Sequence, residues 1–430
     1  MPIKEPHTWR HYRWLVCGLI FAATTINYID RQVLSLLKPV LEREFGWSEI
    51  DYSNIVMAFS ASYAVGYLVF GRIVDWVGTK AGYAVSVFFW SMAAIGHAFV
   101  RTTGGFAFMR AFLGISEAGN FPTAIKATAE WFPKRERAFA AGIFNSGTNI
   151  GAVVAPLVVP WILGIYGWEE AFIWTGCLGF IWLIFWLVFY EIPARQKRLS
   201  KAEYDHIHSD EDEKLEEVKP VSWIRLLGIR QTWAFLLGKF FSDPVWWFLL
   251  FWLPSYFTEV YGVDFKKPNL QLAIIYTACT IGSVGGGYLS SWLINRGWPV
   301  FKARKTSMLL FAVCVMPIMT AQFVGNVWVA VALMSLAVAA HQAWSANIFT
   351  TTSDMFPKHA VSSVVGIGGM AGSVGSTLFP LLVGNLLNHY KLLGNITTGY
   401  NILFLVCGFA YLWAWLLMYW LAPRMERVRL

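Results

Sequence analysis

Long apolar stretches follow one another along almost the whole chain, and this pattern restricts the possible folds more than any other feature. About twenty apolar residues are enough to cross a bilayer as a helix. Lipid offers no hydrogen-bond partners to the backbone, so only helices and closed barrels can span it. Stretches of spanning length are predicted at 14–37, 52–74, 81–100, 104–130, 138–164, 171–190, 231–257, 270–294, 306–324, 327–355, 360–388 and 398–421. The sequence therefore predicts an all-α membrane protein with twelve transmembrane helices.

The composition supports a membrane protein and argues against several other classes. Only 14% of the 430 residues are charged, whereas about a quarter of the residues in a soluble protein are charged. The 34 Lys and Arg residues do not gather into a basic patch, so we expect no nucleic-acid partner. The five cysteines show no metal-ligand spacing, and we expect no metal and no cofactor. We also expect the first apolar stretch to be retained, because it lacks an A-x-A-like cleavage site.

The distribution of Lys and Arg predicts the orientation of the helices. If the N-terminus is cytoplasmic, the inner segments together hold 23 Lys and Arg residues and the outer segments 6. Loops rich in Lys and Arg face the cytoplasm. The one long polar segment, 191–230, is also the richest in basic residues. Both termini are therefore predicted to be cytoplasmic, with the chain in the inner membrane. We expect an N-terminal six-helix half at 1–190, a cytoplasmic linker at 191–230 and a C-terminal six-helix half at 231–430.

A repeated turn supports the division into two pseudo-symmetric halves. The turn after the second span reads Gly71-RIVDWVGTK, and the matching turn in the second half reads Gly287-YLSSWLINRGWPVFKARK. Both combine a glycine, a short amphipathic stretch and basic residues at the surface predicted to be cytoplasmic; two ordinary basic turns are the alternative. The charge run His208-SDEDEKLEE in the linker is interpreted as solvated chain, with room for a short surface helix.

Asp30 and Arg31 lie inside the first apolar stretch, where charges are unusual. A charge at that depth costs at least about 2.5 kcal/mol, so its usual role is to bind a substrate or an ion, or to couple the two. An ion pair between the two neighbours is the structural alternative, but adjacent helix positions diverge by about 100°. Asn27, Tyr28 and Arg31 recur at helical spacing, which places them on one polar stripe facing protein or water.

Arg110 and Glu117 form a second charged group, in the predicted helix 104–130. They are two helical turns apart and so share a face. Their depth places Glu117 near the middle of the membrane and Arg110 level with Arg31. Burial favours the neutral form of a carboxyl group and nearby cations favour its charged form, so a rearrangement of the neighbours can load or unload a proton. A purely structural Arg–Glu clamp is the alternative interpretation.

The second half of the chain offers a cation and several hydrogen-bonding side chains. Lys239 and Asp243 are one turn apart on one helix, where Lys239 either binds an anion with Asp243 restraining it or is simply neutralised by Asp243. His341 and Ser345 share a face at mid-membrane, and Asn347 lies beside them. A lone histidine at this depth can be a satisfied core residue, but this group of polar neighbours favours a lining of the transport path.

Together these motifs resemble the anion:cation symporter branch of the major facilitator superfamily, whose members consist of two six-helix halves. The segments that carry the resemblance are Tyr28-Ile-Asp30-Arg31, Tyr63 and Arg110-x3-Gly114-x2-Glu117-Ala118-x3-Pro122. In that family the corresponding aspartate and glutamate are thought to be protonation sites, which implies this role for Asp30 and Glu117, with Arg110 beside them. The resemblance implies that Arg31, Tyr28 and Tyr63 hold or gate an organic anion.

Two departures from the galactonate-type pattern indicate a subgroup. Galactonate-type members have a glutamine at the positions of Thr148 and Lys239, and Thr148 by itself indicates either a lining or a packing residue. The segments Lys239-Phe-x2-Asp243-Pro-x-Trp246 and Ala340-His-Gln-Ala-x-Ser345 are instead similar to hexuronate transporters, which carry glucuronate and galacturonate. The resemblance therefore implies an anion site that includes Tyr28, Arg31, Tyr63, Thr148, Lys239, His341, Ser345 and Asn347.

The sequence as a whole then predicts a monomeric symporter that imports a hexuronate with protons by alternating access. Its partners would be the sugar-acid anion, protons and the lipid bilayer, with the proton gradient in place of a cofactor. The main alternative is transport of another sugar acid, such as galactonate or glucarate, or anion exchange without protons. We expect no enzyme, because the polar groups lie at mid-depth and not at one interface, and no sensor, because both tails are short.

Overall fold

The computed structural model describes residues 11–209, 222–264 and 267–428. The contacts within the chain divide it into two compact units. Unit 1 contains Met1–Leu34, Ser62–Ala155 and Ile162–Glu217, and unit 2 contains Ser35–Ala61, Pro156–Trp161 and Val218–Leu430. Every element among the described residues is a helix, as the sequence predicts, and no strand occurs among them.

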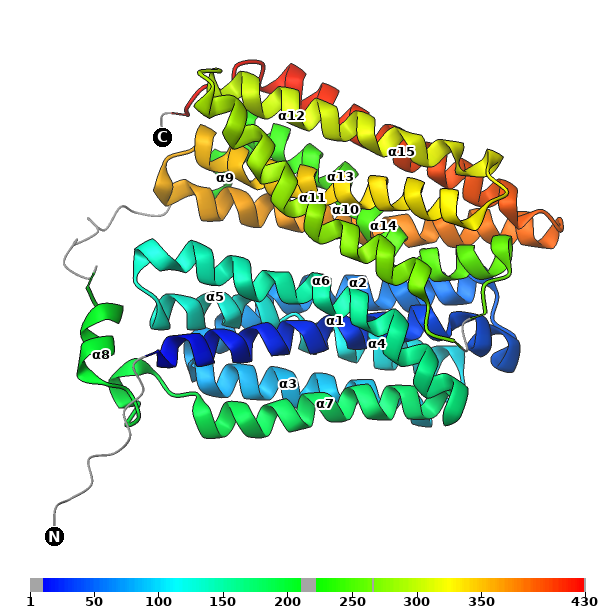
Figure 1. Cartoon of the computed structure of the whole chain (residues 1–430), viewed down its shortest axis with the longest axis horizontal. Coiled ribbons are helices and arrows are strands. Elements are labelled where there is room, and N and C mark those ends of the chain that lie inside the picture. The colour runs from blue at the N-terminus through cyan, green and yellow to red at the C-terminus, as the bar shows by residue number, and fades with distance from the viewer. Residues whose placement is uncertain (1–10, 210–221, 265–266, 429–430) are drawn as a thin grey trace, which may run out of the picture. The chain divides into compact units, whose positions relative to one another are not determined.

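Long helices account for nearly all of the first half of the chain (Figure 1). In order they are α1 (Tyr12–Phe45), α2 (Glu49–Val77), α3 (Thr79–Gly96), α4 (Thr103–Glu117), α5 (Asn120–Trp131), α6 (Lys134–Ile165) and α7 (Trp168–Phe189), with the 3-10 helix η1 (His97–Phe99) extending α3. A glycine brings α7 close to α3, because a Cβ on Gly176 would lie 2.6 Å from Cγ1 of Ile95. Such contacts between small residues are typical of helices that pack in membranes.

The second half of the chain repeats this design. Its helices are the short α9 (Trp223–Leu227) and the long α10 (Arg230–Tyr261), α11 (Leu270–Asn295), α12 (Val300–Val315), α13 (Val327–Met355), α14 (Lys358–Leu392) and α15 (Ile396–Leu421), with the 3-10 helix η3 (Met316–Phe323) continuing α12. Helices α11 and α13 pack backbone to backbone, because a Cβ on Gly286 would lie 2.4 Å from Cα of Ala343. This contact fixes the rotation of α13, the helix that carries His341.

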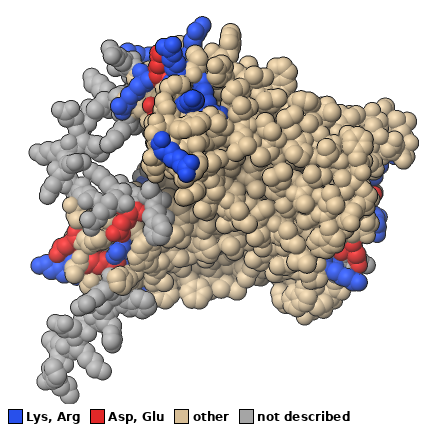
Figure 2. All heavy atoms as spheres, turned by 45° about the horizontal axis from the view of Figure 1, so that its top comes forward, with Lys and Arg blue, Asp and Glu red and all other residues tan. Residues whose placement is uncertain are grey.

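Hydropathy and charge place these helices in a membrane. Nine of the described helices are long and apolar enough to cross one, and α1, α2 and the α4–α5 pair complete the twelve predicted spans. On the face shown in Figure 2, the charged side chains gather toward the two ends, and the wide band between them shows none. A hydrocarbon layer imposes this pattern, since exposed charges are costly at that depth. The predicted all-α fold with twelve spans is confirmed.

The predicted helix 104–130 is broken in its middle. Helix α4 ends at Glu117 and α5 begins at Asn120, so Glu117 lies at a helix end and not in mid-helix. Pro122 supplies one cause, because it has no N–H to bond the carbonyl oxygen of Ala118 four residues earlier. Close packing supplies another, since a Cβ on Gly119 would lie only 2.6 Å from the Ser86 hydroxyl oxygen. The interruption is short, since Ala118 and Gly119 both keep right-handed helical dihedral angles.

A short helix at the start of the linker packs within unit 1, ahead of the charge run. Helix α8 (Lys201–Ile207) brings Glu203, only 3% exposed, to the start of α1. The Glu203 carboxylate accepts hydrogen bonds from the backbone N–H groups of Tyr12 (2.8 Å) and Arg13 (3.1 Å). It therefore caps α1 from outside that helix, where the helix dipole favours a negative charge. Most of the charge run His208-SDEDEKLEE lies outside the described residues.

The contact units differ from the predicted halves. Residues 35–61, which form the end of α1 and the start of α2, belong to unit 2, as do residues 156–161 of α6. The predicted boundaries follow the order of the chain, whereas the units follow its packing. The division into 1–190, 191–230 and 231–430 therefore stays a prediction.

Candidate functional site

A buried ion pair in unit 1 joins the two helices with the most unusual charges. Arg31 on α1 donates from Nε (3.1 Å) and Nη2 (2.9 Å) to one carboxylate oxygen of Glu117 at the end of α4. The two side chains are 3% and 0% exposed. The neighbour Asp30 is not the ion-pair partner of Arg31, in agreement with the divergence expected of adjacent helix positions. One guanidinium therefore holds two helices together through a single carboxylate.

Aromatic rings and an amide hold the Arg31 guanidinium in place. It lies 4.7 Å from the ring centroid of Tyr28 and 4.8 Å from that of Tyr63. Cation–π contacts of this kind are worth ~0.5–2 kcal/mol each. Nη2 also donates to the Asn27 side-chain oxygen at 3.1 Å. The structure thus brings together three of the predicted substrate-binding residues, Tyr28, Arg31 and Tyr63.

A glycine on α6 sets the position of this part of α1. A Cβ on Gly151 would lie 2.5 Å from the carbonyl oxygen of Thr25 and 2.7 Å from Cβ of Tyr28. Only glycine allows α6 to pack so close to α1. Thr148, one turn earlier on α6, donates its hydroxyl to the carbonyl oxygen of Asn145 at 2.8 Å. The Thr148 hydroxyl is therefore engaged within its own helix, and its predicted role in binding stays a prediction.

Arg110 is buried beside this pair, where it contacts the backbone of α1. Its Nη2 donates to the carbonyl oxygen of Arg31 at 2.9 Å. Its positive charge also lies within electrostatic reach of Glu117 and Asp30. Arg110 therefore positions α1 and adds to the positive potential at Glu117, which suits its predicted place in the proton-coupling group.

Asp30 faces a different environment from Arg31, although the two are neighbours in sequence. It is 2% exposed, and no described residue donates a hydrogen bond to either carboxylate oxygen within normal geometry. The nearby Thr175 hydroxyl lies beside Asp30 but donates to the carbonyl oxygen of Phe172 at 3.4 Å. A buried carboxylate without strong donors is costly to keep charged. Asp30 is therefore a buried carboxyl group without a donor among the described residues, and its predicted role in proton coupling stays a prediction.

In unit 2, Lys239 and Asp243 form an ion pair within α10. The Lys239 ammonium lies 2.8 Å from the Asp243 carboxylate and 4.5 Å from the ring centroid of Phe349 on α13. The space for Asp243 comes from α14, where a Cβ on Gly372 would lie 2.2 Å from its Oδ2. The pair is self-neutralised as one of the two interpretations requires, and a second anion could still share the ammonium.

His341 on α13 lies in an aromatic group formed with α10 and α15. Its ring stacks on Trp246, with 5.2 Å between centroids and 3° between planes. Its Nδ1 is hydrogen-bonded to the Tyr411 hydroxyl, which donates to the Ser242 carbonyl oxygen at 3.3 Å. Sequence reasoning missed Tyr411. A tyrosine in an otherwise apolar span was the available signal, because its hydroxyl needs a partner in the membrane.

The hydrogen bonds that Asn347 forms with described residues do not involve this aromatic group, and Ser345 lies on the same helix. Asn347 donates to the carbonyl oxygens of Gly286 and Ala343, both at 2.9 Å. It also accepts from Arg304 at 3.4 Å, so its amide joins α11, α12 and α13. Ser345 is half-buried on the same helix. The structure therefore places Asn347 in helix packing, and the predicted substrate contacts of both residues stay predictions.

Comparisons with known proteins agree with this architecture. Residues 20–380 match the family model of the Major Facilitator Superfamily. The chain is 35% identical over 379 residues to a hexuronate transporter of Escherichia coli, covering 87% of each protein. It is 30% identical over 392 residues to a D-galactonate transporter of another Escherichia coli strain, covering 88% of this chain and 90% of that protein.

A solved structure shows the same fold at low sequence identity. The inward-facing, occupied structure of a bacterial homologue of the human lysosomal transporter Spinster superposes with a TM-score of 0.78 and 16% identity. It covers 96% of this chain and 97% of its own. The relatives are named transporters, and the chain is accordingly a multi-pass membrane transporter and not an enzyme. The family match and the hexuronate relative together show that the chain belongs to the Major Facilitator Superfamily.

Proposed function

We propose that this chain is a symporter that imports a hexuronate, such as glucuronate or galacturonate, together with protons by alternating access. The observation that carries the proposal is the buried pair of Arg31 and Glu117, flanked by Tyr28 and Tyr63. The similarity to a protein named a hexuronate transporter supports the substrate class. The proposal also includes the inner membrane, cytoplasmic termini and a monomer.

Competition between two carboxylates for one guanidinium would provide the coupling. Arg31 stays charged at any physiological pH and can bind a carboxylate through two parallel hydrogen bonds. With Glu117 ionised, that guanidinium is occupied. Protonation of Glu117 removes its negative charge, and Arg31 can then bind the substrate carboxylate. Binding is reciprocal, so the substrate anion in turn favours protonation of Glu117.

Within unit 2, polar residues of α10 and α13 are candidates to bind hydroxyl groups of a sugar acid. A hexuronate has a carboxylate at one end and a ring of hydroxyls, and hydroxyls need hydrogen-bond partners when they leave water. Lys239 and His341 supply charged and polar groups on α10 and α13. Trp246 and His341, whose rings stack on each other, are candidates to pack against the sugar ring.

The direct test is uptake of labelled glucuronate into proteoliposomes with and without an imposed proton gradient. The proposal predicts accumulation only with the gradient, and uptake of protons together with the sugar acid. Equal uptake under both conditions would contradict proton coupling. Absence of glucuronate and galacturonate uptake, with uptake of another anion, would contradict the substrate.

A second candidate is transport of another sugar acid such as galactonate. The 30% identity to a D-galactonate transporter favours it. Thr148 and Lys239 argue against it, because the galactonate-type pattern has glutamine at both positions. Competition of labelled glucuronate uptake by unlabelled galactonate, glucarate and galacturonate distinguishes the two candidates.

A further inference from the structure

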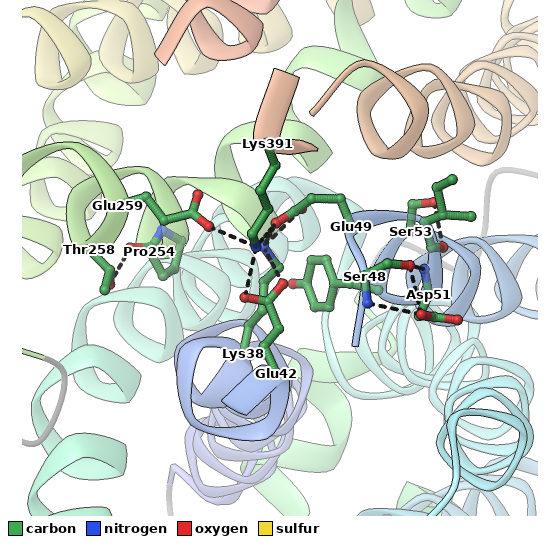
Figure 3. Close-up of polar contacts among 12 residues, drawn as sticks. Lys38, Glu42, Ser48, Glu49, Asp51, Ser53, Pro254, Thr258, Glu259 and Lys391 are labelled. Carbon is green, nitrogen blue, oxygen red and sulfur yellow. Dashed lines mark hydrogen bonds and ion pairs between the residues drawn. The ribbon is translucent and has the colours of Figure 1, made fainter. Parts of the chain in front are cut away.

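Five charged side chains form a compact cluster at one end of unit 2, on the side predicted to face outside. Figure 3 shows their side chains pointing toward one another. We call this group the outer ion cluster; it consists of Lys38 and Glu42 on α1, Glu49 on α2, Glu259 on α10 and Lys391 on α14. No part of the proposed transport site uses it.

The two ammonium groups of the outer ion cluster share the three carboxylates. Lys38 Nζ lies 2.8 Å from Glu49 and 3.0 Å from Glu42. Lys391 Nζ lies 2.9 Å from Glu49, 3.3 Å from Glu259 and 3.5 Å from Glu42. Lys38 and Glu49 are fully buried, while Lys391 is 40% exposed. Every contact from Lys391 joins α14 to another helix.

The cluster is not arranged as a metal site. The Glu42, Glu49 and Glu259 carboxylates come within 4.8 Å of one another, as metal ligands would. However, the Lys38 and Lys391 ammonium groups lie among them and take the place of a cation. Three carboxylates and two ammonium groups leave one negative charge in excess. A proton on one carboxyl group would make the cluster neutral.

The surroundings of each carboxyl group indicate which one takes this proton. Burial raises the pKa of Glu49, but the positive charges of Lys38 and Lys391 outweigh burial and lower this pKa to about 2. Burial raises the pKa of Glu42 above its ordinary value, and the cations offset this only in part. Glu42 faces Lys38 on its own helix, Glu49 from α2, Glu259 from α10 and Lys391 from α14. The Tyr400 hydroxyl, on α15, donates to Glu259 at 2.7 Å.

The cluster is mechanically linked to the candidate site by α1. Arg31 and Lys38 are seven residues apart on this helix, which is two turns or about 10 Å of axial rise. The boundary between the two contact units falls between them, at Leu34 and Ser35. Helix α2 is divided in the same way, at Ala61 and Ser62. The cluster therefore attaches the ends of two helices to α10 and α14, while the remainder of those helices belongs to unit 1.

We propose that the outer ion cluster is a proton-responsive latch that holds the ends of α1 and α2 on α10 and α14, and that a proton on Glu42 favours its closed form. The proposal rests on the proposed alternating access, in which opening to the outside separates these helix ends. Because Glu42 binds its proton more tightly in the closed cluster than in water, low pH favours closure. As the pH rises and Glu42 ionises, the excess negative charge weakens the latch.

The test measures the separation of α1 and α14 directly. Spin labels are placed on Glu44→Cys and Leu393→Cys, two exposed positions next to the cluster, with the five native cysteines replaced by alanine. Pulsed electron resonance in lipid nanodiscs then gives the populations of close and separated helix ends. The latch predicts more of the close population at pH 5.5 than at pH 8.

If the latch exists, one variant should favour the close population and two others should favour the separated population. Glu42→Gln mimics the protonated form, so it should keep the close population at both pH values and lose the pH response. Glu49→Gln leaves Lys38 with a weakened partner and should raise the ratio of separated to close populations about tenfold or more. Lys391→Gln should also favour separation, and it leaves no buried cation unpaired, so it remains informative if Glu49→Gln does not fold.

Glu169→Gln is the matched control, since Glu169 forms an exposed pair with Arg101 (3.3 Å) in unit 1, away from the cluster. It should leave both populations unchanged. An unaltered pH response in Glu42→Gln, or unaltered populations in both Glu49→Gln and Lys391→Gln, would overturn the latch. These distances are measured without substrate, so failure of the latch leaves proton-driven hexuronate uptake untouched, and failure of that uptake leaves the distances untouched.

Discussion

The Arg31–Glu117 pair in unit 1 and the Lys239–Asp243 pair in unit 2 each join a cation to a carboxylate, but they differ in location and burial. Arg31 and Glu117 come from two helices, and both are almost completely buried. Lys239 and Asp243 lie one turn apart on a single helix, and Asp243 is 20% exposed. Loss of the first pair removes a link between two helices and leaves a buried charge, whereas the second can break without moving a helix. We therefore propose coupling for the first pair and selectivity for the second.

The largest expected effect comes from the geometry of Arg31. Arg31→Lys keeps the charge but loses the planar fork that reaches Glu117 through Nε and Nη2. We expect glucuronate uptake to fall about 100-fold or more, because a lysine cannot bind a carboxylate through two parallel hydrogen bonds. The control is Arg101→Lys, because Arg101 forms an exposed ion pair with Glu169 elsewhere in unit 1. This variant should transport normally. Near-normal uptake by Arg31→Lys would rule out the bidentate role.

The next effect concerns selectivity at Lys239. Lys239→Gln removes the charge near Phe349 and Asp243. We expect hexuronate binding to weaken about tenfold, since a charged hydrogen bond is worth ~1.5–3 kcal/mol, and binding of other sugar acids to change less. Thermal shifts with a panel of sugar acids measure this difference. An equal loss for every ligand would mean that Lys239 is structural.

A smaller effect is expected from crowding the second pair. A Cβ on Gly372 would press on the Asp243 carboxylate, whereas a Cβ on Gly369, one turn away on α14, would meet nothing within 4 Å. Gly372→Ala should therefore displace Asp243, lower the free energy of unfolding by ~1–3 kcal/mol and alter hexuronate affinity. Gly369→Ala should do neither. Identical affinity and melting temperature in the two variants would show that Asp243 can move at no cost.

The smallest effect is expected at an ion pair near the edge of unit 1. Burial raises the pKa of Glu136. The hydrogen bonds and positive charges of His206 and Arg13 outweigh burial and lower this pKa below its ordinary value. A lowered pKa stabilises the folded state above the ordinary carboxyl pKa, and this contribution is lost as the pH falls. Glu136→Gln should therefore lower the melting temperature slightly at pH 7 and not at pH 3. An equal difference at both pH values would contradict an electrostatic origin.

The sequence predicted the spans well because bilayer thickness sets their length. It did not predict the break after Glu117, although Pro122 was visible. A proline in a membrane helix either kinks or breaks it, depending on which neighbouring groups satisfy the freed backbone. Here Gly119 approaches Ser86 closely at the interruption, and that contact is a property of the packed fold.

The candidate site was predictable in part, because bilayer thickness also sets the depth of each residue within its span. Depth alone placed Arg110 level with Arg31, and in the structure both arginines lie at Glu117. Depth could not show that Asn347 turns toward Gly286 and not toward His341, because the rotation of α13 depends on its contact with α11. The outer ion cluster escaped sequence reasoning because Lys38 and Glu49 lie outside the predicted spans 14–37 and 52–74. The spacing of Lys38 and Glu42, one turn apart at the end of the first span, was its only local signal.

The measurement that tests coupling most directly compares two assays on one variant, Glu117→Gln. This change removes the carboxylate that competes for Arg31 and mimics the protonated state permanently. We predict that the reconstituted variant still exchanges labelled glucuronate for unlabelled glucuronate across the membrane, yet fails to accumulate it when a proton gradient is imposed. If Glu117→Gln concentrates glucuronate as the unmodified protein does, Glu117 is not the essential coupling site, and the exchange of carboxylates at Arg31 is contradicted.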